Sequence, residues 1–141
     1  KYQDLKLMKN LLVAGAAALL LTACSESGPK EIATGKDQCE NCKMTITEAK
    51  YATQLVTEKG RNYKFDDISC MDDYTTSNTE VAQNSDEYVA DFPTGTFFDR
   101  STATLVQGGS IKSPMGGNTQ AYKDKAAAEK AAAELGATVI Q

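Results

Sequence analysis

The segment that most limits what this chain can fold into is its apolar N-terminus. Met8–Cys24 starts with the cation Lys9, continues through the apolar run Leu11–Leu21 and ends in LTAC. A membrane-spanning helix needs about 20 apolar residues, whereas this run fits the core of a secretory signal, about 7–15 residues long. We therefore predict an exported protein, with residues 1–23 as a signal peptide and residues 1–7 as an extension upstream of its start.

The cysteine at the end of this signal predicts a lipid anchor. LTAC resembles the lipobox of bacterial lipoproteins, in which the cysteine becomes the lipidated N-terminus of the mature chain. Acyl chains such as palmitate each contribute about 0.8 kcal/mol per buried CH₂, so several of them attach a protein without a spanning helix. We expect Cys24 to carry the lipid and residues 24–36 to form a flexible tether. The protein would then lie outside the cytoplasm on a bacterial membrane, either the cytoplasmic or the outer one.

Residues 37–141 remain for folding, which suffices for one domain with a modest core. Their patterns predict an α+β fold with two similar small halves, about 37–76 and 87–141, packed as one compact unit. A shared antiparallel sheet would carry both helices, and the polar stretch 75–86 would link the halves. The expected strands are 44–47, 51–57, 62–65, 87–92, 96–98, 119–122 and 137–140, with a further short element of unassigned type at 102–107. Asp66 or Asp67 would cap the first helix, and Asp124 and Gly136 would bound the second.

Composition excludes several classes of function. The net charge is −4 and the lysines are scattered, so no basic surface suggests a nucleic acid as partner. The chain contains no histidine, which rules out a serine–histidine triad. It also lacks a glycine-rich phosphate loop. We expect a binding protein rather than an enzyme.

The stretch CENCKM raises the question of what its sulfur atoms do. With Cys24 lipidated, Cys39, Cys42 and Cys70 remain, and an odd number permits at most one disulfide. The cysteines alone leave several possibilities open: a thiol–disulfide oxidoreductase, a zinc site, or an interaction lipoprotein held by one disulfide across about thirty residues. Cys70 should lie early in a helix, where the helix dipole favours a thiolate.

The methionines shift the balance towards a soft metal. Beyond the signal, Met44 and Met71 closely follow cysteines, and Met115 lies in the glycine-rich loop SPMGGN. Thiolate and thioether are soft ligands that select Cu(I), whereas histidine and carboxylate suit harder ions. The pattern therefore predicts Cu(I) as the bound ion.

Five motifs in order, CENCKM, YATQLV, KFDDISCM, EYVADFPTGTFFD and IKSPMGG, resemble those of the NosL family over about residues 37–140. These proteins are lipoprotein copper chaperones of nitrous oxide reductase maturation. The resemblance implies a monomeric Cu(I) carrier with two similar ββαβ-type halves. It would pass copper to an ABC-type maturation complex, and from there to nitrous oxide reductase, in denitrification.

The resemblance also implies the ligands. The metal role carries over to Cys42, Met44 and Met115, with a second group made of Cys39, Cys70 and Met71. One position departs from the family: Lys43 stands where a glycine is common, which predicts a stiffer and more positive loop.

Overall fold

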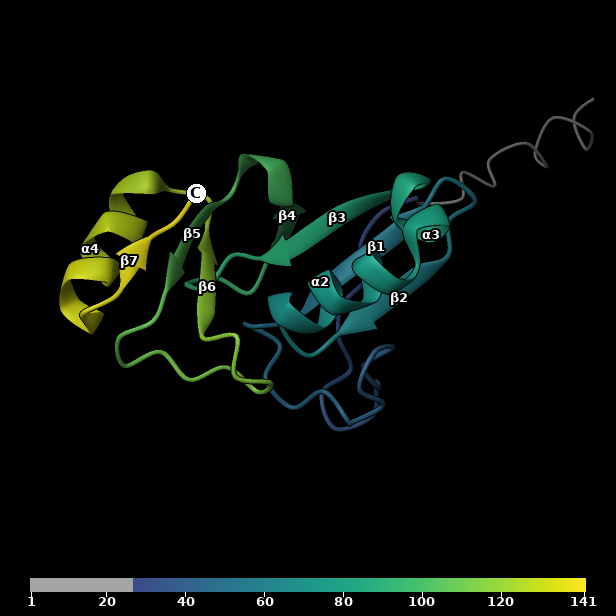
Figure 1. Ribbon diagram of the computed structural model, residues 1–141, viewed down its shortest axis with the longest axis horizontal. Coiled ribbons are helices and arrows are strands. Elements are labelled where there is room, and N and C mark those ends of the chain that lie inside the picture. Colours follow the sequence, from purple (N-terminus) through teal and green to yellow (C-terminus); the bar gives the residue numbers. More distant parts are fainter. Residues whose placement is uncertain (1–26) are drawn as a thin grey trace, which may run out of the picture.

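The computed structural model describes residues 27–141 of the chain (Figure 1). These residues form two antiparallel sheets, each with a helix packed on it. The predicted signal peptide and Cys24 lie outside the described residues. The first unit contains β1 (Thr53–Thr57), β2 (Asn62–Phe65), α2 (Ile68–Ser77), α3 (Thr79–Gln83), β3 (Ser85–Ala90) and β4 (Phe97–Asp99). After a 3-10 turn at Arg100–Thr102, the second unit contains β5 (Thr104–Gln107), β6 (Thr119–Tyr122), α4 (Lys125–Leu135) and β7 (Thr138–Val139). Within residues 27–141, the helices are too short or too polar to cross a membrane.

Both units share one ββαβ topology. In each, two consecutive strands pair as antiparallel neighbours, a helix follows, and the next strand returns to the free edge of the first strand. The resulting strand orders are β2-β1-β3-β4 and β6-β5-β7. The predicted class, a mixed α and β fold with two similar small halves, is confirmed.

The predicted single shared sheet is wrong, because the two units keep separate sheets. Strands β3 and β4, which the sequence assigns to the second half, complete the first sheet, with Val89 between Thr53 and Phe98. The sheets meet at a parallel bridge between Asp91 and Ala121. Alternation of side chains identifies a strand but does not name its partner, so the pairing could not be derived from the pattern alone.

The predicted linker 75–86 is also mostly helical. Helix α2 continues to Ser77, and α3 follows after Asn78, whose backbone N–H donates to the Tyr74 carbonyl. The polar composition of this stretch indicates a loop, but in the structure its residues form the solvent side of two short helices. This run brings the chain back to the start of β3.

Part of the predicted tether belongs to the folded domain. The Gln54 side chain accepts a hydrogen bond from the Lys30 N–H at 3.0 Å and donates one to the Lys30 carbonyl at 2.6 Å. The Asn62 amide donates to the Gly28 carbonyl at 3.1 Å, and Ile32 is buried in the core. The chain is therefore packed against β1 and β2 from Gly28 onwards.

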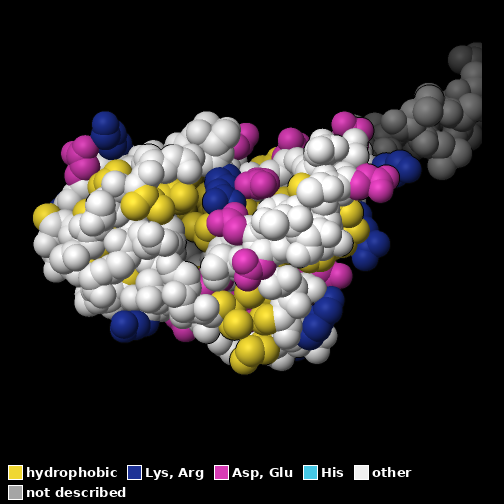
Figure 2. Space-filling model, in the orientation of Figure 1, with side chains coloured by type: hydrophobic (Ala, Val, Ile, Leu, Met, Phe, Trp, Pro, Cys, Tyr) yellow, Lys and Arg dark blue, Asp and Glu magenta, His cyan; other side chains and the backbone are white. Residues whose placement is uncertain are grey.

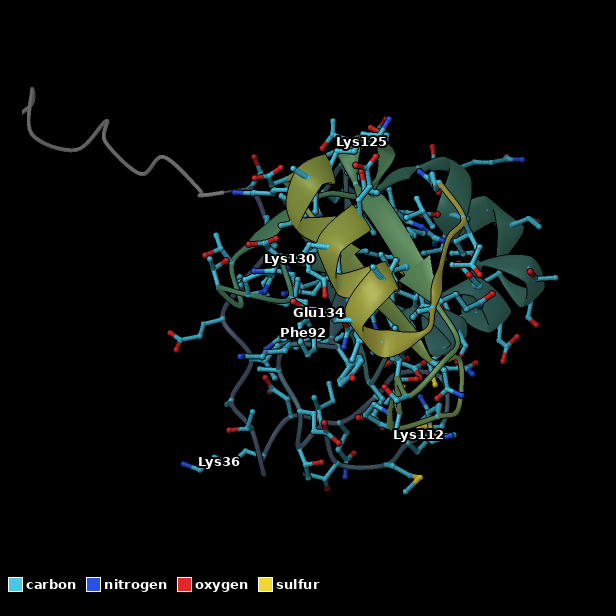
Figure 3. The ribbon with its side chains drawn as sticks, turned by 90° about the vertical axis from the view of Figure 1, so that its left-hand side faces the viewer. Lys36, Phe92, Lys112, Lys125, Lys130 and Glu134 are labelled. Atoms are coloured by element: carbon cyan, nitrogen blue, oxygen red, sulfur yellow. The ribbon has the colours of Figure 1, made fainter. Side chains whose placement is uncertain are left out.

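Two apolar clusters form the core, and the first also takes in Leu105 and Ala121 of the second unit. The first lies between α2 and its sheet, and it includes Leu55, Phe65, Met71, Val89 and Phe98. The second lies under α4 and includes Val106, Ile111, Tyr122, Ala128 and Ala132. Helix α4 buries Ala128 and Ala132 and turns Lys125, Lys130 and Glu134 to solvent, as Figure 3 shows. Asp124 caps this helix and Gly136 ends it in the left-handed conformation, as the sequence predicts.

The end of α4 positions the loop between β5 and β6, which carries Met115. Gly109 has a φ of +58° and lies so close to the Leu135 carbonyl that an added Cβ would overlap this oxygen. The Ser110 N–H donates to the same carbonyl at 2.9 Å. Gly108 also has a positive φ, but its Cβ position is open. The start of the loop is therefore clamped onto the helix at Gly109.

We predict that Gly109→Ala destabilises the protein more than Gly108→Ala. Both substitutions carry the strain of a left-handed backbone, about 1–2 kcal/mol. The overlap with Leu135 adds about 1–3 kcal/mol to the Gly109 variant alone. Urea denaturation measures both free energies of unfolding, and equal losses would contradict the clamp.

Candidate metal centre

The CENCKM segment forms a tight loop that places two thiols at the edge of the first unit. The Cys39 N–H donates to the Met44 carbonyl at 2.8 Å, and the Lys43 N–H donates to the Cys39 carbonyl at 2.9 Å. The Glu40 N–H donates to the Lys64 carbonyl at 2.7 Å, which fastens the loop to β2. No helix begins after the second cysteine within this segment, so the loop differs from a thioredoxin-like dithiol, as the sequence predicts.

Three thiols converge where this loop meets the first turn of α2. The Sγ atoms of Cys39, Cys42 and Cys70 all lie within 4.8 Å of one another, and the cysteines are free. Cys39 and Cys70 are buried, whereas Cys42 is partly exposed. The α2 helix presents Cys70 because Asp67 caps the helix and accepts the Cys70 N–H at 3.1 Å. A ring of three sulfur atoms with one open side suits a single soft ion.

Cys42 and Cys70 are held in the protonated form when no metal is bound, because the pKa of each thiol is raised. Burial raises the pKa of Cys70, and the neighbouring thiols Cys39 and Cys42 raise it further. Burial also raises the pKa of Cys42. The predicted thiolate at Cys70 is therefore wrong, because desolvation outweighs the helix dipole. A cation that enters the cluster has to displace protons.

A carboxylate lies directly beside the exposed thiol. The Cys42 thiol donates to Asp66 Oδ2 at 3.6 Å, while Asp66 Oδ1 is buried without a hydrogen-bond partner. Burial raises the pKa of Asp66, although the bond from Cys42 works in the opposite direction. The sequence offers either Asp66 or Asp67 as the cap of α2, and Asp67 is the one that caps it. Asp66 is thus a polar group of the site that the sequence does not identify.

The three methionines lie in different environments. Met44 is 58% exposed and Met115 is 39% exposed, whereas Met71 is fully buried in the apolar cluster under α2. Figure 2 shows hydrophobic side chains gathered beside acidic ones at the lower edge of the molecule, where Figure 1 places the loops before β1 and before β6. Met44 and Met115 therefore present thioethers to solvent, and Met71 serves the packing of the core.

The loop that carries Met115 is docked onto the first turn of α2. The Met115 N–H donates to Asp67 Oδ2 at 3.0 Å, and the Ser113 hydroxyl donates to the same oxygen at 2.7 Å. Burial would raise the pKa of Asp67, but the hydrogen bonds from Ser113, Ser69 and two backbone N–H groups outweigh it and lower the pKa. The structure thus brings the Met115 backbone beside the turn that bears Cys70. Whether the thioether binds the ion with the thiols stays a prediction.

Lys43 lies in a strained backbone conformation within the cysteine loop. Its φ is +64°, in the left-handed region that side chains rarely adopt. Its side chain forms an ion pair with Glu40 at 3.3 Å, which is exposed and contributes little. The conformation explains why glycine is the residue that the resemblance predicts at this position.

Comparison with known proteins identifies the family. The sequence model of the NosL family matches residues 29–141. No curated protein sequence matches the chain. Among solved structures, the chain is similar to the crystal structure of the copper chaperone NosL from Shewanella denitrificans, with 18% identity and a TM-score of 0.68. That alignment covers 82% of this chain and 92% of the other, so the fold is shared over nearly the whole of that protein.

We predict that Met71 and Met44 contribute very differently to the free energy of unfolding. Met71→Ala should lower the free energy of unfolding by about 2–5 kcal/mol, because it leaves a cavity in a packed core. Met44→Ala removes an exposed side chain and should change stability by about 0.5 kcal/mol or less. Chemical denaturation of the metal-free variants measures both. A large loss for Met44→Ala would mean that its thioether packs rather than faces solvent.

Proposed function

This chain belongs to the NosL family, and we propose that it is a metallochaperone that binds Cu(I) as cargo. The observation that carries the proposal is the cluster of three thiols within 4.8 Å of one another, beside the exposed thioether of Met44. Thiolate and thioether favour Cu(I) over harder ions, and histidine is absent from the sequence. Catalytic turnover is not part of this role.

The proposed ligands divide into a buried and an exposed group. Cys39 and Cys70 lie in the interior, whereas Cys42, Met44 and Met115 reach the surface. A neutral thioether binds copper without forming disulfides, which suits an oxidising compartment. The exposed ligands are the ones that a receiving protein could reach and replace, so the ion would be released from this side.

The proposed recipient is an extracytoplasmic cuproenzyme. Membership of the NosL family supports nitrous oxide reductase as the client, reached through an ABC-type maturation complex. The structurally similar Shewanella protein is described as a copper chaperone, which agrees with a carrier role. We propose that this protein acts as a monomer outside the cytoplasm.

The proposed lipid anchor would hold the metal centre away from the membrane. The chain joins the domain at Gly28, which bonds to Asn62 at the start of β2, whereas Asp66 beside the cluster follows the end of β2. The two points therefore lie at opposite ends of this strand. A lipid on Cys24 would be at most about 14 Å from Gly28, since each residue spans up to about 3.5 Å. The domain would sit close to the lipid with its copper site facing outwards.

We predict that the protein binds one Cu(I) per chain and that Met115→Ala weakens this binding about ten-fold, which corresponds to about 1.4 kcal/mol. The variant should also show a smaller copper-induced rise in melting temperature, because a ligand that binds only the folded state stabilises it. Its metal-free stability should change little, since Met115 is partly exposed. Anaerobic titration against a Cu(I) chelator, with thiol counting and thermal unfolding, measures these quantities.

Two observations would contradict the proposal. Catalytic cycling of two thiols with exported substrates would indicate an oxidoreductase. Zinc binding that Cu(I) cannot displace would indicate a structural zinc site. Ag(I) serves as a control ion, because it is also soft and should compete with Cu(I).

We predict that Cys24→Ala releases the protein from membranes without changing its Cu(I) affinity. The acyl chains would no longer provide membrane attachment, and the metal centre lies at the far end of β2 from the point where the chain enters the domain. Membrane fractionation and copper titration of the soluble fraction test this. A variant that sediments with membranes as the parent does would exclude the lipid anchor.

A further inference from the structure

The carboxylate of Asp67 lies between the two units and contacts both of them. The side chain is 1% exposed. Its Oδ1 accepts hydrogen bonds from the Cys70 N–H at 3.1 Å and the Ser69 hydroxyl at 2.7 Å. Its Oδ2 accepts from the Ser113 hydroxyl at 2.7 Å and the Met115 N–H at 3.0 Å. One oxygen thus faces the cysteine-bearing helix, and the other faces the methionine-bearing loop.

A second contact docks the same loop onto α2. The Cα of Gly117 approaches Ser69 so closely that an added Cβ would lie 2.8 Å from the Ser69 Cβ. The bonds from Ser113 and Met115 connect positions 46 and 48 residues away from Asp67 in the sequence. Two independent contacts therefore hold the loop against the first turn of the helix.

We propose that Asp67 is a positioning residue for the metal centre, which holds Met115 in place so that both units supply ligands to one ion. This inference rests on the proposed function as a Cu(I) carrier. Groups outside the ligand shell that fix a ligand typically change metal affinity about 10–100-fold when they are lost. Asp67 does so through the backbone of Met115, and it does not touch the ion.

Helix capping alone does not explain the role of this side chain. A cap needs one oxygen that accepts a backbone N–H of the first turn. Asp124 caps α4 in this way, with Oδ1 accepting the Ala126 N–H at 2.8 Å. In Asp67, Oδ1 performs the capping and Oδ2 is engaged by the distant loop. The bonds to Oδ2 add nothing to the helix itself.

The substitution Asp67→Asn separates the two roles. Asparagine caps helices about as well as aspartate, so its amide oxygen keeps the bond to Cys70. Its amide nitrogen then faces the Ser113 hydroxyl and the Met115 N–H, and a donor cannot accept the Met115 N–H. The variant should retain α2 and lose the hold on the loop.

We expect Asp67→Asn to weaken Cu(I) binding about ten-fold, measured anaerobically against a Cu(I) chelator. The sulfur scattering around copper in X-ray absorption should fall, because the thioether of Met115 leaves the ion. The matched control is Asp124→Asn, the same exchange at the cap of α4, which should leave affinity and spectrum unchanged. A parent-like affinity and spectrum in Asp67→Asn would overturn the proposal.

A double-mutant cycle with Met115→Ala tests whether Asp67 acts through Met115. If it does, Asp67→Asn costs little further affinity once the thioether is absent, so the two losses do not add. An equal further loss in the Met115→Ala background would overturn the positioning role. So would an unchanged affinity in Met115→Ala alone, although Cu(I) binding by the thiols would then still stand. A parent protein that binds no Cu(I) would instead refute the proposed function.

A milder variant keeps the test decisive if Asp67→Asn does not fold. Ser113→Ala leaves the cap intact and removes one bond to Oδ2, together with the bond that the Asn118 N–H donates to the Ser113 hydroxyl at 2.7 Å. The loss of the Oδ2 bond alone, about 1 kcal/mol, corresponds to about a five-fold change. Ser113→Thr retains the hydroxyl and should restore the affinity. Unchanged affinity in Ser113→Ala, or no recovery in Ser113→Thr, would overturn the proposal.

Discussion

The buried carboxylate of Asp67 joins the first turn of α2 to the loop before β6, and the arrangement that we propose for the metal centre depends on it. Placing a charge in the interior costs free energy unless hydrogen bonds replace its water. Here four donors from α2 and the loop before β6 provide this compensation, and they lower its pKa despite burial. The buried carboxylate keeps all four of these hydrogen bonds only while both units are in contact. This requirement couples the integrity of the first turn of α2 to the position of a loop almost fifty residues away.

The metal centre combines buried and exposed sulfur. Cys39 and Cys70 belong to the apolar cluster of the first unit, so the floor of the site is as rigid as the core around it. Cys42 and Met44 lie on the loop at the surface, where backbone bonds and the strained Lys43 fix its path. A rigid floor would hold the ion in one place, and an open rim would allow a partner protein to approach it. Burial keeps the Cys42 and Cys70 thiols protonated, so the proposed entry of copper would be linked to proton release.

Much of the fold follows from local patterns. Alternating residues and glycine turns predict the hairpins, and Asp124 and Gly136 mark both ends of α4. The sulfur motifs CENCKM and DDISCM identify the right region, because residues close in sequence stay close in the loop and in the helix turn. Local chemistry also explains why two similar α+β halves could be recognised from two methionine-bearing loops. These features depend on neighbours within a few residues, which the sequence displays directly.

By itself, the sequence determined the elements, the soft character of the site and the family resemblance. Only the tertiary structure decided which strands pair, that Gly28–Ile32 packs on the domain, and that Met71 belongs to the core. It also decided that Asp67 contacts Ser113 and that burial raises the pKa of Cys70. These outcomes depend on contacts between distant segments and on the solvent that they exclude. Neither these contacts nor the exclusion of solvent can be derived from the spacing of residues along the chain.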